Sequence, residues 1–165
     1  MTGGRLVAIY VTPAATAPMA ARDRIDAIAG TGLRGDRYAT GTGTYSGSGR
    51  GPRDVTLIER EAIDAARTED GRVDVREDQT RRNLVTEGVA LNHLVGRTFR
   101  VGAVRMRGVR LAEPCVYLEQ LSGLVGVRAA FVHRGGLRAE VLDDGELRVG
   151  DAIDTISDGQ QVDGA

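Results

Sequence analysis

The single cysteine of the sequence, Cys115, is the residue best suited to reactive chemistry, and it follows Glu113 and Pro114. A lone cysteine is by itself more often a buried, inert core residue than a reactive one. Proline favours the first turn of a helix, however, and a thiol at a helix N-terminus has a lowered pKa because it feels the positive end of the helix dipole. The thiolate that forms is a nucleophile and a soft metal ligand. The residues alone therefore leave Cys115 open as a reactive or an inert thiol.

Three polar runs contain the residue types that bind anions: Gly35-Asp36-Arg37, Thr80-Arg81-Arg82-Asn83 and Arg134-Gly135-Gly136. A guanidinium group binds phosphate through two parallel hydrogen bonds, and glycine lets the backbone approach a ligand. Each run is also the pattern of a tight turn with a solvated ion pair. Adjacent arginines in a strand point to opposite faces, so we expect at most one of Arg81 and Arg82 to face a given pocket. Together with the cysteine run, these runs favour a binding site.

The two histidines, His93 and His133, do not form a recognisable metal site. Neither stands at metal-ligand spacing from a second His or Cys, so the sequence predicts no zinc centre. His93 lies in an apolar context, which favours a structural role. His133 could meet Cys115 in space, but no spacing rule predicts such a pair.

Composition excludes several classes of function. All 22 basic residues are arginine, so the chain has no lysine for a pyridoxal phosphate aldimine or for a Walker-type phosphate loop. The net charge of -1 and the aromatic content of 4% argue against nucleic acid and membrane partners. One cysteine allows no internal disulfide, and the N-terminus lacks the apolar core of a signal peptide. We therefore expect a cytoplasmic protein.

Hydrophobic patterning predicts a mainly β, barrel-like fold with a few short helices. Strands are expected at residues 5–11, 24–29, 54–58, 83–86, 98–101, 104–111, 137–142 and 152–156. Helices are expected at residues 59–67, 91–95, 115–121 and 125–132. No βαβ alternation is evident, which argues against a doubly wound sheet. We expect one domain over residues 5–156 and a polar tail over 157–165.

The motifs follow one another in the order seen in a known family. GLRGDRY, TRRNLVTEGVALNHLVGRTFRVG, EPC and the RGG run resemble the MOSC domain, which forms the C-terminus of molybdenum-cofactor sulfurases and also occurs alone. The resemblance covers roughly residues 5–156 and implies a β-barrel-like fold. It further implies that Cys115 coordinates molybdenum or carries sulfur. Arg37 and Arg81 match arginines near the pterin phosphate, Thr80 and Asn83 belong to the same cofactor-binding motif, and Arg134 is a weaker match.

The leading hypothesis from this resemblance is a molybdopterin enzyme that reduces N-hydroxylated or N-oxygenated small molecules. Cys115 would be the catalytic residue and the metal ligand, and a separate electron-transfer partner would be needed because one cysteine cannot ligate an iron–sulfur cluster. Alternatives are a sulfur carrier with a persulfide on Cys115, a non-catalytic cofactor carrier, and a structural protein with an inert thiol. Ala112 stands where some relatives have a second cysteine, so sulfur transfer would lack a nearby resolving thiol.

Overall fold

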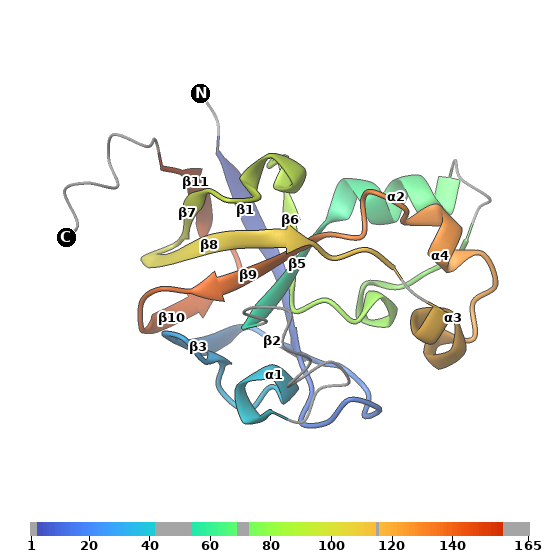
Figure 1. The fold of residues 1–165 in the computed structure, drawn as a ribbon, viewed down its shortest axis with the longest axis horizontal. Coiled ribbons are helices and arrows are strands. Elements are labelled where there is room, and N and C mark those ends of the chain that lie inside the picture. Colours follow the sequence, from blue (N-terminus) through green and yellow to red (C-terminus); the bar gives the residue numbers. More distant parts are fainter. Residues whose placement is uncertain (1–2, 42–53, 69–72, 115, 157–165) are drawn as a thin grey trace.

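Antiparallel strands close into a barrel in the computed structural model, which describes residues 3–41, 54–68, 73–114 and 116–156 (Figure 1). The barrel strands are β1 (Gly4–Val11), β5 (Val55–Glu59), β6 (Leu84–Glu87), β7 (Thr98–Val101), β8 (Val104–Leu111), β9 (Leu137–Val141) and β11 (Ala152–Thr155). They are ordered β11-β7-β8-β9-β5-β6-β1, and β11 pairs again with β1 to close the ring. The mainly β, barrel-like prediction is therefore confirmed.

One βαβ unit interrupts the antiparallel pattern, contrary to the sequence expectation. Strands β5 and β6 pair in parallel, and helix α2 (Arg60–Thr68) makes the crossover between them. The helix buries Ala62, Ile63 and Ala66 on one side and leaves polar residues on the other. Because this unit occurs once in the described chain, no repeating alternation signals it in the sequence.

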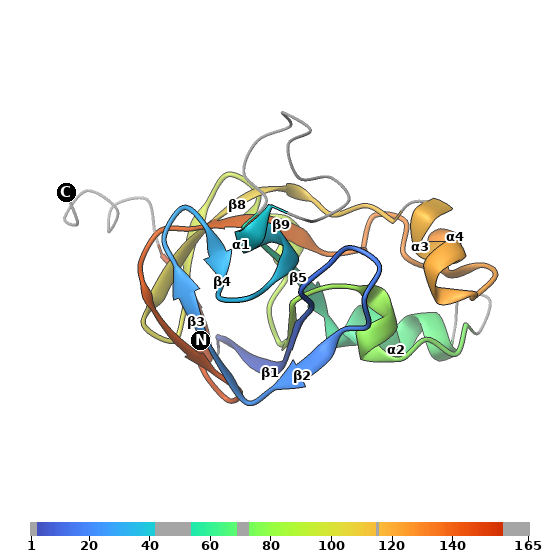
Figure 2. The same ribbon diagram turned by 90° about the horizontal axis from the view of Figure 1, so that it is seen from below.

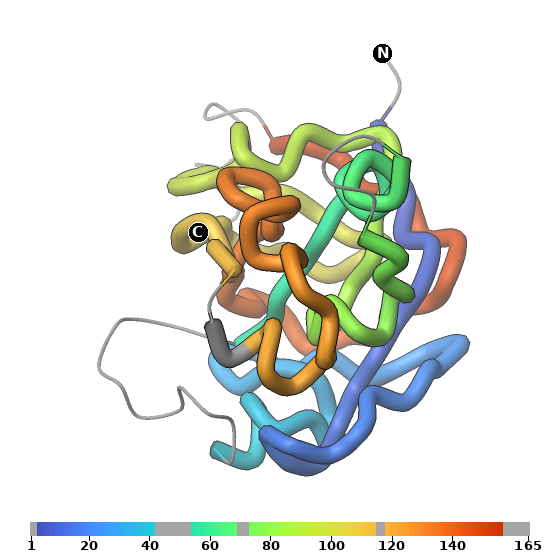
Figure 3. The backbone as a smooth tube through the Cα atoms, turned by 90° about the vertical axis from the view of Figure 1, so that its right-hand side faces the viewer, coloured from blue at the N-terminus to red at the C-terminus, as the bar shows by residue number. Residues whose placement is uncertain are grey.

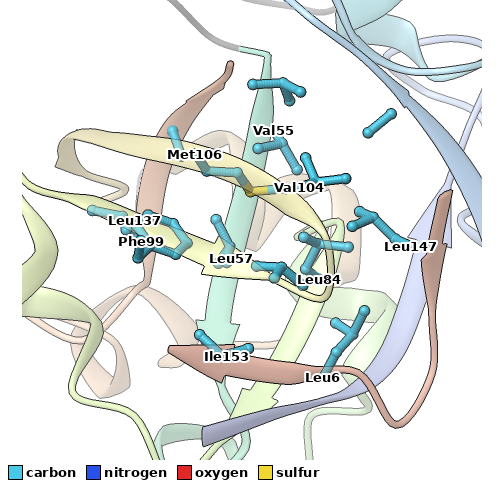
Figure 4. Packing of buried hydrophobic residues seen from close by; sticks show 14 of the residues in the cluster. Leu6, Val55, Leu57, Leu84, Phe99, Val104, Met106, Leu137, Leu147 and Ile153 are labelled. Carbon is cyan, nitrogen blue, oxygen red and sulfur yellow. The ribbon is translucent and has the colours of Figure 1, made fainter. Parts of the chain in front are cut away.

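The barrel interior is the larger of two apolar clusters. Alternate residues of the strands fill it, among them Leu57, Phe99, Met106 and Leu137, and Figure 4 shows their side chains converging between the strands. On β8, Val104 and Met106 are buried while Arg107 is exposed, so one face of that strand is in contact with solvent.

The second cluster joins the outside of the barrel to three helices. Ile58 of β5 and Val85 of β6 pack there with Ile63, Leu118 and Phe131. The other helices on this side are α3 (Val116–Ser122) and α4 (Val127–Ala130), and Figure 3 shows all three in front of the strands. Strand β5 is therefore covered on both faces, which explains its nearly continuous apolar run.

Five of the shortest elements were not predicted, because they hold too few residues to show a period. They are β2 (Ala20–Arg22), β4 (Gly32–Leu33), α1 (Arg37–Thr40), η1 (Glu77–Thr80) and β10 (Gly145–Arg148). The strand expected at 24–29 is β3 (Arg24–Ile28), and η2 (Leu91–Leu94) lies in the helix expected at 91–95. Strands β10, β3 and β4 form a second sheet that lies with α1 apart from α2, α3 and α4 (Figure 2). The helix expected at 125–132 is only the single turn of α4, and the 91–95 segment is a 3-10 turn. The expected tail, 157–165, lies outside the described residues.

Within the described part of the chain, no helix combines the length and apolar character needed to cross a membrane.

Candidate functional site

The Arg82 side chain connects three of the sequence motifs. Its Nη2 donates to the carbonyl oxygen of Ala112 at 2.7 Å, and its Nε donates to the carbonyl oxygen of Gly135 at 2.8 Å. Arg82 is only 8% exposed, so these bonds are made away from bulk water. A Cβ atom on Gly135 would lie 2.4 Å from the Ala112 oxygen, which explains glycine at this position. The arginine run therefore fixes the segment that leads to Cys115, although Cys115 itself lies outside the described residues.

A second link ties the cysteine run to the glycine run. Glu113 accepts a hydrogen bond from the backbone N–H of His133 at 2.7 Å and lies 2.9 Å from Nδ1 of the same ring. The backbone of His133 is left-handed, with φ of 63°, which is uncommon for a residue with a side chain. His133 is thus paired with Glu113, whereas His93, expected to be structural, is exposed on η2.

Replacing Arg82 by methionine should lower the free energy of unfolding by about 3 kcal/mol, because two buried carbonyl oxygens would lose charged donors. Arg107→Met is the matched control, because Arg107 is an exposed arginine of β8, and we expect it to change stability by less than about 0.5 kcal/mol. Denaturant unfolding followed by circular dichroism measures both. Equal effects of the two substitutions would contradict the bracing role of Arg82.

The Asp36 carboxylate is the centre of a buried polar network. Asp36 is fully buried, caps α1 by accepting from the N–H of Tyr38 at 3.2 Å, and accepts from the N–H of Thr12 at 3.1 Å. Asn83 Nδ2 donates to Asp36 at 3.2 Å and to the Tyr10 carbonyl oxygen at 3.0 Å. The Asn83 side-chain oxygen accepts from the backbone N–H and hydroxyl of Thr56. The predicted Asn83 therefore belongs to this buried network, and both the oxygen and the nitrogen of its amide are hydrogen-bonded within the protein.

Arg37 is buried beside Asp36, so the alternative interpretation of this turn, a solvated Asp–Arg pair, does not hold. Its Nη1 lies 3.3 Å from Asp36 Oδ1, and its Nη2 donates to the carbonyl oxygen of Arg81 at 2.9 Å. The guanidinium carbon lies 4.3 Å from the centre of the Tyr38 ring. Arg37 thereby connects the Gly35-Asp36-Arg37 turn to the arginine run, and its direct contact with a cofactor remains a prediction.

Arg81 and Arg82 point in different directions, as expected, although Arg81 is not in a strand. Arg81 ends η1 in a left-handed conformation with φ of 63°. Its guanidinium donates to the carbonyl oxygens of Ala15 and Ala17, each at 2.5 Å. Arg81 also lines a cavity of about 220 Å³ between the β1–β2 loop, η1 and the end of α3.

The two remaining predicted residues differ in their relation to this network. Thr80 is buried, donates to the Glu77 carbonyl oxygen at 2.7 Å and accepts from the N–H of Arg82. Arg134 is half-exposed, and its Nε donates to the Ala130 carbonyl oxygen at the end of α4. The structure therefore brings Arg37, Thr80, Arg81 and Asn83 together, while Arg134 turns toward α4.

Sequence reasoning missed Tyr38 and Arg138, which lie next to this network. Arg138 is 8% exposed, and within the described part of the chain its buried Nη1 has no hydrogen-bond partner. Burial alone would raise the pKa of the Tyr38 phenol. The charges of Arg37, Arg82 and Arg138, with a hydrogen bond from Arg138, outweigh burial and hold that pKa below its ordinary value. Alternation along β9 predicts an exposed Arg138, and no sequence signal shows that its face is covered.

Tyr38 and Tyr10 should ionise in a defined order as the pH rises. Burial, the negative charge of Glu77 and a hydrogen bond to Glu77 raise the pKa of Tyr10 to about 12. Ultraviolet titration of phenolate should therefore show Tyr38 ionising below pH 10 and Tyr10 near the end of the range. In Tyr38→Phe the early transition should disappear, and in Tyr10→Phe the late one. An early transition that survives in Tyr38→Phe would refute the assignment.

Comparison with known proteins agrees with this fold. The family model described as MOSC domain matches residues 44–154. The fold is similar to that of the YuaD protein from Bacillus subtilis, with a TM-score of 0.75 at 15% identity over 93% of this chain and 96% of that one. It is also similar to YiiM from Geobacillus stearothermophilus, with a TM-score of 0.69 at 14% identity over 94% of this chain and 76% of the other.

YiiM from Escherichia coli is a further similar structure, with a TM-score of 0.63 at 19% identity over 93% of this chain and 70% of that one. Identities this low show the shared fold alone. No curated protein matches the sequence significantly.

Proposed function

Because the chain belongs to the MOSC domain family, we propose that it binds the molybdenum cofactor and reduces N-hydroxylated or N-oxygenated small molecules, with Cys115 as the ligand to molybdenum. The observation that carries the proposal is the convergence of the motifs through Arg82, which bonds to both Ala112 and Gly135. The segment immediately before Cys115 is thus held by the arginine and glycine runs. A reactive residue requires such a fixed frame.

The buried arginines near the segment that precedes Cys115 fit a cofactor that carries phosphate. Three arginines, Arg37, Arg82 and Arg138, are at least nine-tenths buried, and no described residue accepts a hydrogen bond from Arg138 Nη1. Asp36 is the carboxylate that contacts this group among the described residues, and it lies against Arg37. Buried cations in excess of buried carboxylates favour an anionic ligand. In this proposal Arg82 and Arg138 would face the cofactor's phosphate, while Arg37, Thr80, Arg81 and Asn83 hold the surrounding backbone.

The bound cofactor would supply two-electron redox chemistry at its metal. Reduction of a hydroxylamine breaks the N–O bond, consumes two electrons and two protons, and releases an amine and water. The electrons would come from a separate redox partner, since a single cysteine cannot ligate an iron–sulfur cluster. The proposal includes a cytoplasmic location, where a lone thiol stays reduced.

Within the chain, the proposed role of Glu113 is to position the cysteine segment. Its carboxylate accepts from the backbone of His133 and lies against the same ring. Arg82 holds Ala112, on the other side of Glu113 in the chain. Two independent anchors before Cys115 would restrict the positions its sulfur can reach, which favours a single coordination geometry.

Molybdenum content tests the proposal directly. The wild-type chain and Cys115→Ala are purified from a host that makes the cofactor and analysed for metal, with Arg107→Met as the control. We expect molybdenum in the wild type and the control and a large loss in Cys115→Ala. Metal retained equally by all three would refute the ligand assignment. A metal-free wild type with Cys115 heavier by one sulfur atom would replace the proposal with the sulfur-carrier hypothesis.

A further inference from the structure

Arg138 is an unusual residue for the middle of a barrel strand. Leu137, Ala139 and Val141 of β9 point into the barrel core, so Arg138 points to its outer face. That face is covered, since Arg138 is only 8% exposed and its Nη1 is buried without a hydrogen-bond partner among the described residues. A buried N–H donor of a charged group is destabilising when it lacks an acceptor, unless a ligand supplies one. The position therefore calls for an anion.

The described residues around Arg138 include further arginines. On β8, Arg110 is the Cα partner of Arg138, and side chains directly opposite each other in a sheet lie about 5 Å apart. Arg37 lies against the Tyr38 ring, and the charges of Arg37 and Arg82 act on the same phenol as that of Arg138. An anionic ligand at Arg138 would therefore have positively charged neighbours.

The available negative charge is used elsewhere. Asp36 contacts this group among the described residues, and its oxygens accept from Thr12, Tyr38, Asn83 and Arg37. Residues 42–53, which follow α1 in the chain, contain no aspartate or glutamate. Among the described residues, Arg138 thus lies near a phenol and the charges of Arg37 and Arg82, with Asp36 as the carboxylate in contact, and a doubly charged oxyanion suits such a set better than a single charge.

We propose that Arg138 and Tyr38, flanked by Arg82 and Arg110, form a subsite for the phosphate group of a small molecule. Arg138 Nη1 donates to a phosphate oxygen, and the Tyr38 hydroxyl donates to a second one. The subsite deepens the proposed function, in which Arg82 and Arg138 face the cofactor's phosphate, and it uses residues other than those that the family resemblance assigns to the cofactor. It requires no molybdenum chemistry, so it can be tested on the chain alone. The phosphate can come from the proposed cofactor or from a phosphorylated substrate.

Inorganic phosphate is the first probe, and calorimetry at constant ionic strength with chloride as the other anion measures its binding. We expect the cofactor-free wild type to bind phosphate and Arg138→Gln to bind it about tenfold or more weakly. Arg107→Gln removes an exposed arginine from β8 and should bind as the wild type does. Equal binding by the wild type and Arg138→Gln would overturn the proposal, as would no binding by the wild type.

Stability gives a second readout that a merely structural Arg138 would not produce. In chloride, Arg138→Gln should unfold at the same temperature as the wild type or a higher one, because it removes a buried positive charge that has no carboxylate partner among the described residues. Phosphate should raise the unfolding temperature of the wild type but not of the variant. Phosphate should also raise the pKa of Tyr38, since it neutralises the surrounding positive charge. A variant that is less stable in chloride and equally stabilised by phosphate would overturn the proposal.

The source of the phosphate is then distinguished with cofactor-loaded protein. If the cofactor's phosphate fills the subsite, added phosphate no longer shifts the Tyr38 titration, and Arg138→Gln retains less molybdenum. If a substrate's phosphate fills it, loaded protein still responds to phosphate, and Arg138→Gln keeps its metal but loses affinity for phosphorylated substrates. Either result supports the subsite. Absence of molybdenum from the wild type and every variant would refute the proposed function. Phosphate binding by the cofactor-free chain would then remain the test of the phosphate subsite.

Discussion

Replacing Cys115 by serine should lower the rate of hydroxylamine reduction by more than about 100-fold, beyond the loss typical of residues that only orient metal ligands. A serine hydroxyl is a hard donor that stays protonated near neutral pH, whereas a cysteine thiolate is a soft ligand suited to a thiophilic metal. The substitution changes one atom, so the barrel and the Arg82 contacts to Ala112 and Gly135 should persist. Turnover is measured with a hydroxylamine substrate and a chemical electron donor.

The control for this prediction separates loss of chemistry from loss of fold. Cys115→Ser should unfold at the wild-type temperature within a few degrees, while Arg107→Met should keep both stability and turnover. Reduction of the substrate by Cys115→Ser at the wild-type rate would contradict the proposed function. Loss of turnover with full retention of molybdenum would show that Cys115 acts on the substrate and not as the ligand.

Most of the barrel could be predicted because its strands alternate apolar and polar residues over several positions. Strands β7 and β8 match the predicted ranges, and β8 shows why: Val104 and Met106 are buried while Arg107 is exposed. The single crossover through α2 could not be predicted, since whether β5 and β6 pair in parallel depends on contacts between distant segments. Strands of two to four residues such as β4 and β10 are too short to show a period.

The candidate site was predicted only as a set of motifs, because sequence gives residue types but not the directions of long side chains. Arg81 and Arg82 are neighbours that make different contacts. Arg81 donates hydrogen bonds to the β1–β2 loop, whereas Arg82 donates them to Ala112, in the segment before Cys115, and to Gly135. Arg138 has the sequence pattern of a solvated strand residue, and its burial depends on tertiary packing around β9. Such residues are identified by their partners in space.

Replacing Asp36 by alanine should lower the free energy of unfolding by about 4 kcal/mol, the usual cost of removing one partner of a buried ion pair. Asp36 is fully buried, and its carboxylate accepts from Thr12, Tyr38, Asn83 and Arg37 at 3.1 to 3.3 Å. Without it, the Arg37 guanidinium keeps its buried charge and loses its counter-ion. For a chain of this size we expect the melting temperature to fall by about 8 to 16 °C.

Two further substitutions show whether charge or hydrogen bonding dominates at Asp36. Asp36→Asn keeps the shape and one acceptor oxygen, so the difference between it and Asp36→Ala isolates the hydrogen bonds, and its own effect isolates the charge. Asp26→Ala, which removes an exposed partner of Arg34, should cost less than about 1 kcal/mol. An effect of Asp36→Ala no larger than that of Asp26→Ala would contradict the central role of this carboxylate.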